Sequence, residues 1–138
     1  MPPERLSPSA AASRRKTCLR VVVIEDNEDA AVTLRDVLEL EGHEVAIAHD
    51  GRRGIETVLE WQPDVVLCDV GLPDIDGLEV GARLRAAGFR ARLVAVTGYA
   101  SPADIERSRR AGFDEHVPKP VDPGQLDELL GIASTPAV

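Results

Sequence analysis

Aromatic side chains are scarce in this sequence: its 138 residues include one Trp, one Tyr and two Phe. The hydrophobic core must therefore be aliphatic, because hydrophobic residues still make up 43% of the chain. That fraction, beside 29% charged residues, is typical of a globular protein and excludes a disordered or fibrous chain. The length suits a single domain with a modest core.

Cysteine is also scarce, and the two cysteines, Cys18 and Cys68, form neither a CxxC pair nor a metal-ligand spacing. Cys68 lies inside an apolar run, where we expect it to act as a small buried hydrophobic residue. No stretch reaches the ~18 apolar residues of a membrane helix, and the first residues lack the apolar segment of a signal peptide. We therefore expect a cytoplasmic protein that does not enter a membrane.

Basic residues are outnumbered, with 16 Lys and Arg against 24 Asp and Glu, and the net charge is -8. Residues 1–20 alone sum to +4, so the rest of the chain carries -12. Such an acidic body should repel nucleic acid and suit a bound cation or a basic partner surface. Residues 1–18, rich in Pro, Ser and Ala, indicate a flexible basic arm that keeps the protein soluble or touches an anionic surface.

Short apolar runs alternate with amphipathic segments five times from residue 19 onward. The expected strands are residues 19–25, 43–49, 63–69, 91–97 and 113–118, and the expected helices are residues 27–42, 50–62, 76–88, 101–112 and 122–131. Continuous apolar strands that alternate with helices predict an α/β domain with a parallel sheet covered on both faces. We expect this domain to span residues 19–131, followed by a tail of residues 132–138.

Several residues indicate where the helices begin and which side they bury. Asn27, Asp50 and Ser101 are expected to cap helix starts. Gly81 should weaken its helix by about 1 kcal/mol relative to Ala. The helix at residues 27–42 is expected to present an apolar face made by Ala30, Leu34, Val37, Leu38 and Leu40.

Polar residues gather where the predicted strands end, which is the edge at which open parallel sheets place their chemistry. The residues at these strand ends are Glu25, Asp26, Asp69, Thr97 and Lys119. Three carboxylates at one edge would repel one another unless a cation lay among them. Mg²⁺ suits this place, because it accepts a few carboxylate oxygens and keeps waters for a phosphate group.

The other two side chains extend the same chemistry. The Lys119 ammonium could pair with an anion docked on the metal, and the Thr97 hydroxyl adds a hydrogen-bond donor. Asp69 could then act as a nucleophile that forms an acyl phosphate.

Each of these residues also has a plain structural explanation. The first two acids could simply favour a helix N-terminus, and Asp69 could cap the following turn. Thr97 could be an ordinary strand residue, and Lys119 an exposed turn lysine. Their joint occurrence at successive strand ends outweighs these separate explanations.

Four ordered segments resemble the motifs of one family, the receiver domain of two-component response regulators. They are "VVVIEDNED", "VVLCDVGLPDIDG", "LVAVTGYA" and "HVPKPVDP", and the resemblance covers roughly residues 19–131. The ending "GFDEHVPKPVD" is also similar to receivers attached to hybrid sensor histidine kinases. The resemblance implies a CheY-like, flavodoxin-like (βα)5 fold with a doubly wound parallel sheet in the strand order 2-1-3-4-5.

The resemblance implies a phosphorelay role centred on Asp69. This residue would take a phosphoryl group from a phosphohistidine of a histidine kinase or a histidine phosphotransfer protein. Asp26, Asp69 and the backbone carbonyl of Gly71 would hold Mg²⁺, with Glu25 acting largely through water, and Mn²⁺ could substitute. Such a module would catalyse only its own phosphorylation and dephosphorylation.

The resemblance also implies a switch. Lys119 would pair with the phosphoryl group, and Thr97 would move inward to bond it. The Lys119–Pro120 peptide bond is expected to be cis. The position three residues before Lys119 usually carries Tyr or Phe in the family, and here it is His116. We expect this imidazole to alter the coupling with Thr97 and to make it pH-sensitive.

Three residues near the acceptor bear on access and on the lifetime of the acyl phosphate. Gly71 offers no side chain to guide or block water, whereas Tyr99 could shield the phosphoryl group, so no lifetime is predicted. Gly98 leaves the approach open, and we expect small donors such as acetyl phosphate to react.

Three rival functions are compared with the same residues. A phosphatase with an aspartyl nucleophile needs a second acid two residues after that nucleophile, where this chain has Gly71. An FMN carrier on this fold needs a phosphate loop rich in Ser, Thr and Gly, where this chain has the acidic "EDNEDA". A receiver-like scaffold that is never phosphorylated is disfavoured by the full residue set, although His116 leaves it open.

The partner surface is expected on the last two helices and the last strand. The residues after Gly131 are too few for an output domain, so we expect either a stand-alone regulator or a fragment of a larger protein. In either case we expect the effect to come through docking on another protein. Direct binding to nucleic acid is not expected. The same surface could form a homodimer.

Overall fold

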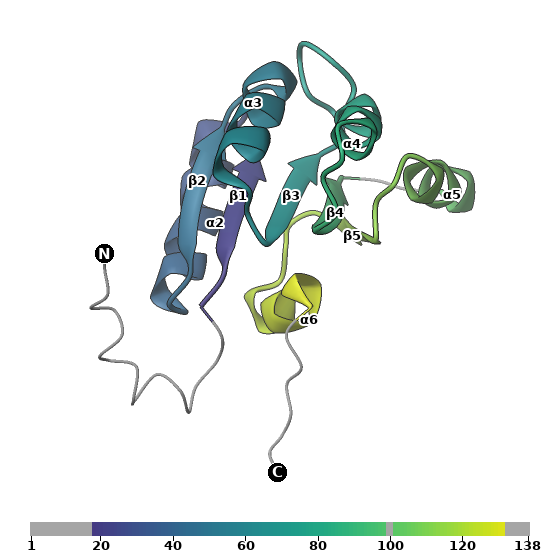
Figure 1. The fold of residues 1–138 in the computed structure, drawn as a ribbon. Helices are drawn as coiled ribbons and strands as arrows, with labels where there is room; N and C mark the ends of the chain where they lie inside the picture. The colour runs from purple at the N-terminus through teal and green to yellow at the C-terminus, as the bar shows by residue number, and fades with distance from the viewer. Residues whose placement is uncertain (1–17, 99–100, 132–138) are drawn as a thin grey trace.

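The structure, a computed structural model, describes residues 18–98 and 101–131. Within these residues, five strands form one parallel sheet in the order β2-β1-β3-β4-β5 (Figure 1). The strands are β1 (Arg20–Ile24), β2 (Glu44–Ala48), β3 (Val65–Asp69), β4 (Arg92–Thr97) and β5 (Glu115–Pro118). The helices are α2 (Glu28–Leu40), α3 (Gly51–Trp61), α4 (Gly77–Ala86), α5 (Pro102–Arg110) and α6 (Leu126–Leu130), the last preceded by the short 3₁₀ helix η2 (Pro123–Gln125). The predicted fold class and strand order are confirmed.

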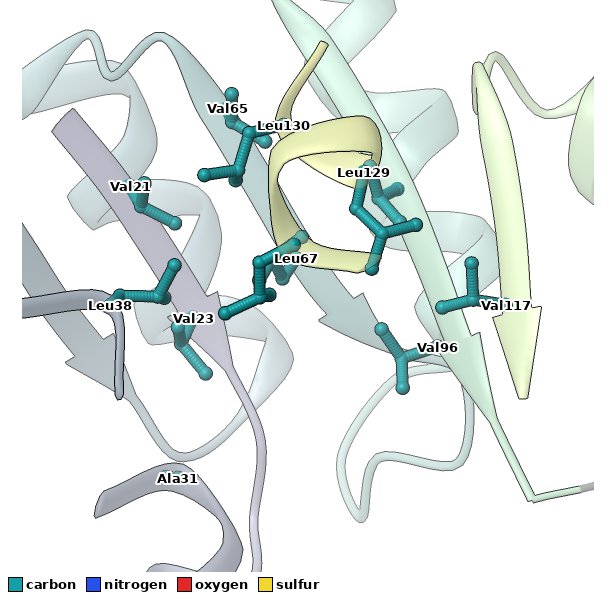
Figure 2. Packing of buried hydrophobic residues seen from close by; sticks show 12 residues of the cluster. Val21, Val23, Ala31, Leu38, Val65, Leu67, Val96, Val117, Leu129 and Leu130 are labelled. Atoms are coloured by element: carbon teal, nitrogen blue, oxygen red, sulfur yellow. The ribbon is translucent and has the colours of Figure 1, made fainter. Parts of the chain in front are cut away.

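Two apolar layers make the core, one on each face of the sheet, and both are mainly aliphatic, although Phe89 and Phe113 are buried in one of them. Alternate residues of a strand point to opposite faces, so Val21 and Val23 pack beneath α2 and α6, whereas Val22 and Ile24 pack beneath α3 and α4. Figure 2 shows Leu129 of α6 lying on the first face, close to the side chains of the central strands. Burial on both faces explains why the strands read as continuous apolar runs.

The predicted caps are confirmed. The side chain of Asn27 accepts a hydrogen bond from Ala30 N at the start of α2, and Asp50 accepts from Arg53 N at the start of α3. Ser101 forms a capping box at the start of α5. These oxygens satisfy N–H groups that have no partner within their helices.

The predicted apolar face of α2 is wrong at two positions. The fully buried residues of this helix are Ala31 and Leu38, whereas Ala30 is exposed and Leu40 is 86% exposed. Leu40 follows Leu38 by two residues, or about 200° of helical rotation, and so points away from the sheet. Leu34 and Val37 are half-buried at the border of the buried stripe.

The last predicted helix is also shorter than expected. Asp122 caps a 3₁₀ turn by accepting from Gly124 N at 2.9 Å, and the α-helix begins only at Leu126. Gly131 ends it in the left-handed conformation, with φ of 81°. Pro123 and Gly124 explain the late start, because neither residue favours an α-helix interior.

The predicted arm, apart from Cys18, and the predicted tail of residues 132–138 lie outside the described residues. The division of the chain into arm, domain and tail therefore stays a prediction. Cys68 is fully buried, as expected. None of the helices among the described residues has both the length and the apolar composition needed to cross a membrane.

Candidate functional site

Three acids converge at the carboxyl edge of the sheet. Glu25 follows β1 and Asp69 ends β3, and both are buried, with 7% and 6% of their surface exposed, whereas Asp26 is exposed. One carboxylate oxygen of each residue lies within 4.8 Å of the other two. The strand ends thus bring together the carboxylates that the sequence analysis singled out.

Lys119 completes this cluster from the end of β5. Its Nζ atom lies 3.0 Å from Oε1 of Glu25 and 3.2 Å from Oδ2 of Asp69. Its backbone N–H donates to the Thr97 carbonyl at 2.7 Å, and its peptide bond to Pro120 is cis, as expected. Lys119 is therefore not a plain exposed turn lysine.

The pKa values of Glu25 and Lys119 are shifted by burial and by the charges of neighbouring groups. Burial raises the pKa of Glu25, and the charge of Asp69 adds to this, although the Asn27 N–H and Lys119 oppose it. Burial alone would lower the pKa of Lys119, but the carboxylates of Glu25 and Asp69 outweigh it and leave that pKa raised. The cluster holds more negative charge than one ammonium compensates, which favours a bound cation.

The acids also have the local roles that plain structural explanations suggest. Oε2 of Glu25 accepts from Asn27 N at 3.0 Å, just before α2. Oδ1 of Asp69 accepts from Gly71 N at 3.1 Å in the turn that follows β3. These bonds fix the two carboxylates, and they leave the other oxygen of each paired with Lys119.

The proposed switch residues lie on neighbouring strands. Thr97 ends β4 and pairs with Pro118, one residue beyond the Asp69–Val96 pair. His116 is half-buried in β5 and pairs with Ala95, so its side chain shares a face with Thr97. Gly98 is exposed, and Tyr99 lies outside the described residues.

An apolar cavity of about 550 Å³ opens beside the cluster, a feature that the sequence did not predict. Its walls come from α2, from the central strands and from the segment between β5 and α6. They include Val23, Leu34, Val37, Leu67, Val96 and Leu126, and the cavity reaches Asp69 and Lys119.

Sequence reasoning missed one acid in the loop after β3. The carboxylate of Asp74 accepts hydrogen bonds from Gly51 N at 2.7 Å and from Arg52 N at 2.9 Å. Its partners come more than 20 residues earlier in the chain, so no local motif gives them away.

The donor set fits a hard divalent cation. Carboxylate and carbonyl oxygens are the protein ligands that Mg²⁺ prefers. Glu25, Asp26 and Asp69 supply three such groups in one place. A cation there would offset the mutual repulsion of the acids, and an anion docked on it would meet the Lys119 ammonium.

Comparison with known proteins agrees with this geometry. A family model described as the response regulator receiver domain matches residues 21–131. The chain is 34% identical over 112 residues to the response regulator MprA of Mycolicibacterium vanbaalenii, covering 81% of this chain and 47% of that protein. The MprA protein of Mycobacterium tuberculosis is 33% identical with the same coverage.

Solved structures give the same result. A CheY-like receiver domain from Methanospirillum hungatei superposes with a TM-score of 0.78 at 30% identity, covering 83% of this chain and 92% of that one. The BeF3-activated receiver domain of RstA from Klebsiella pneumoniae superposes with a TM-score of 0.76 at 25% identity, covering 81% and 95%.

The chain spans about half the length of the curated relatives that it matches. Those relatives are response regulators, and the likeness to receivers of hybrid sensor kinases, which they do not show, stays a prediction. A receiver domain is typically a signalling module without an enzymatic turnover of its own. With its matching family model, its fold and its acidic cluster, the chain belongs to the response regulator receiver family of two-component signal transduction.

Proposed function

We propose that Asp69 is the phosphoacceptor of a phosphorelay and that it takes its phosphoryl group from a histidine kinase or a histidine phosphotransfer protein. One observation carries the proposal: Asp69 ends its strand within a cluster of two further carboxylates and one ammonium. A buried carboxylate is costly unless its charge is compensated, and here the compensating groups are those that phosphoryl transfer needs.

The proposed step transfers a phosphoryl group from the donor histidine to Asp69. A carboxylate oxygen of Asp69 bonds to phosphorus as the phosphorus–nitrogen bond of the donor breaks. The donor imidazole keeps the electron pair of that bond and takes up a proton from water. Lys119, already 3.2 Å from Asp69, pairs with the phosphoryl oxygens that arrive there.

A divalent cation is part of the proposal. Asp26, Asp69 and the Gly71 carbonyl would hold Mg²⁺, with Glu25 acting through water, and Mn²⁺ could take its place. When bound, the cation offsets the negative charge that builds up between the carboxylates and the phosphoryl oxygens. The Gly71 N–H and the Lys119 ammonium then keep the acceptor oriented.

The conformational change that follows phosphorylation is proposed to involve Thr97 and His116. The Thr97 hydroxyl turns toward the phosphoryl group, and the imidazole repacks in the space that this leaves. The backbone bond from Lys119 N to the Thr97 carbonyl couples the ends of β4 and β5. A protein partner, or a second copy of this chain, would sense the change on the surface of α5, β5 and α6.

Two alternatives are kept as outcomes of the test. His116, in the place of Tyr or Phe, leaves open a receiver-like scaffold that is never phosphorylated. A phosphatase with an aspartyl nucleophile lacks its second acid, because Gly71 occupies that position and has no side chain.

The test is phosphate incorporation into the full chain from acetyl phosphate and Mg²⁺, read by intact mass, beside a phosphohistidine donor. We expect the mass of one phosphoryl group on the wild type and none on Asp69→Asn. Asp64→Asn is the matched control, since Asp64 precedes the opposite end of the same strand and accepts a backbone N–H there. A wild type that gains no phosphate from either donor, or an Asp69→Asn variant that gains as much, would overturn the proposal.

A further inference from the structure

The loop after β3, residues 70–76, is attached to the start of α3 by one side chain. Oδ1 of Asp74 accepts from Gly51 N at 2.7 Å, and Oδ2 accepts from Arg52 N at 2.9 Å. Asp50 accepts from Arg53 N at 2.8 Å. Two carboxylates, one local and one from the loop, thus satisfy the first three N–H groups of the helix.

The neighbouring residue reinforces this attachment. A Cβ atom on Gly51 would lie 2.4 Å from Cγ1 of Ile75, so the Ile75 side chain rests directly on the helix backbone. The helix itself is seated on the sheet, because a Cβ atom on Gly54 would lie 2.5 Å from Cδ1 of Ile24. The loop is therefore held against an element that cannot shift independently of β1.

The other end of the loop meets the acceptor. Gly77 N donates to the Val70 carbonyl at 2.9 Å, and Gly71 N donates to Oδ1 of Asp69 at 3.1 Å. The segment that Asp74 fixes is thus the segment that orients the Asp69 carboxylate and carries the Gly71 carbonyl.

We propose that Asp74 is a positioning residue for the metal site: by tying the loop to the first turn of α3, it holds the Gly71 carbonyl and the Asp69 carboxylate in the arrangement that Mg²⁺ requires. This inference rests on the proposed function, because it assigns the Gly71 carbonyl as a ligand. Groups that hold metal ligands in place without touching the metal contribute to the metal affinity of a site.

The attachment depends on both carboxylate oxygens of Asp74. The side chain of Arg52 lies 3.9 Å from Oδ2 but is 72% exposed, so that ion pair adds little. Partial burial raises the pKa of Asp74, but the Gly51 and Arg52 N–H groups outweigh it and hold that pKa at about 2. At neutral pH the carboxylate is thus ionised, and both of its oxygens can accept hydrogen bonds.

The test measures divalent cation binding to the unphosphorylated full chain, by calorimetry with Mg²⁺ and by the electron spin resonance of free Mn²⁺. We expect Asp74→Ala to weaken binding about 10-fold, near the lower end of what such supporting residues contribute. Asp74→Asn keeps one acceptor oxygen, so its cation affinity should lie between that of Asp74→Ala and that of the wild type. At saturating Mg²⁺, phosphate incorporation should return to within about twofold of the wild-type rate, because affinity is what the attachment controls.

Asp64→Ala is the matched control, since it removes the same charge and a bond of the same kind, from Arg20 N at 2.8 Å. That bond lies about 16 Å away, one strand length from the acceptor. Amide exchange at Gly51 and Arg52 should speed up in Asp74→Ala and not in the control.

The outcomes separate this inference from the proposed function. A folded Asp74→Ala variant with wild-type cation affinity would overturn the inference and leave the proposed function standing, provided the wild type gains phosphate. Equal weakening in Asp64→Ala would also overturn it, since charge alone would then explain the effect. A wild type that binds neither cation would overturn both.

Discussion

The Nζ atom of Lys119 lies 3.2 Å from Oδ2 of Asp69, so the ammonium lies among the carboxylates as their counter-charge. It also lies 3.0 Å from Glu25, and the pKa of Lys119 is raised because the two acids outweigh the effect of its burial. A divalent cation that enters this cluster therefore meets a positive charge already in place. Under the proposed function, Lys119 and a bound cation would repel each other until a phosphoryl group paired with the ammonium.

Lys119→Met should consequently bind Mg²⁺ more tightly than the wild type. Two unit charges 4 Å apart near a protein surface interact by about 4 kcal/mol, which water and salt reduce. We expect a gain of about tenfold at low ionic strength, which corresponds to about 1.4 kcal/mol. Calorimetry measures it, and Arg110→Met on the exposed side of α5 is the control for charge. Equal or weaker binding by a folded Lys119→Met variant would contradict the prediction.

Gly77→Ala should destabilise the fold by about 3 kcal/mol, because overpacking against the backbone cannot be relieved. A Cβ atom there would lie 2.4 Å from the Asp69 carbonyl oxygen and 2.6 Å from Val70 Cα. Gly71→Ala is the matched control, since nothing lies within 4 Å of its Cβ position, and it should stay within about 0.5 kcal/mol of the wild type. Urea denaturation of both variants checks this, and similar midpoints would show that the close approach at Gly77 is not a constraint.

Gly81→Ala should also destabilise the protein, against the expectation from helix propensity. Propensity alone would have Ala stabilise the helix by about 1 kcal/mol. The Cβ atom, however, would lie 2.4 Å from Cε2 of Phe113, which is buried. We expect a net loss of about 1 to 2 kcal/mol from this overpacking. In a Phe113→Leu background the loss should shrink, so a double-variant cycle with an interaction energy near zero would contradict the explanation.

Gly81 illustrates what the sequence could and could not predict. The alternation of apolar runs and helices fixes the layers of the fold, because period and burial are local properties. The helix caps at Asn27, Asp50 and Ser101 are equally local and were correctly predicted. Gly81 has its reason in an aromatic ring 32 positions away, and propensity could only describe it as a weakness.

The site likewise has features that the sequence predicted and features that it did not. Glu25, Asp69 and Lys119 were predicted to meet because each follows a strand of one parallel sheet, and topology brings strand ends together. The cavity beside the acids depends on how α2 and α6 lie over the sheet, which no local periodicity sets. The attachment through Asp74 joins a loop to a helix more than 20 residues away in the sequence, and a single acid in a turn does not predict such a contact.

The hydrogen bonds of Asp74 predict an acid-sensitive contribution to stability. Its pKa is held at about 2 in the folded chain, against an ordinary value of 3.8. A carboxyl whose pKa is lowered by folding stabilises the fold fully above its unfolded value, and this contribution is lost as the pH falls through the folded value. Asp74→Asn should therefore be less stable than the wild type at neutral pH, and the difference should shrink between pH 3.8 and about 2. Urea midpoints across this range measure it, and a constant difference would contradict the argument.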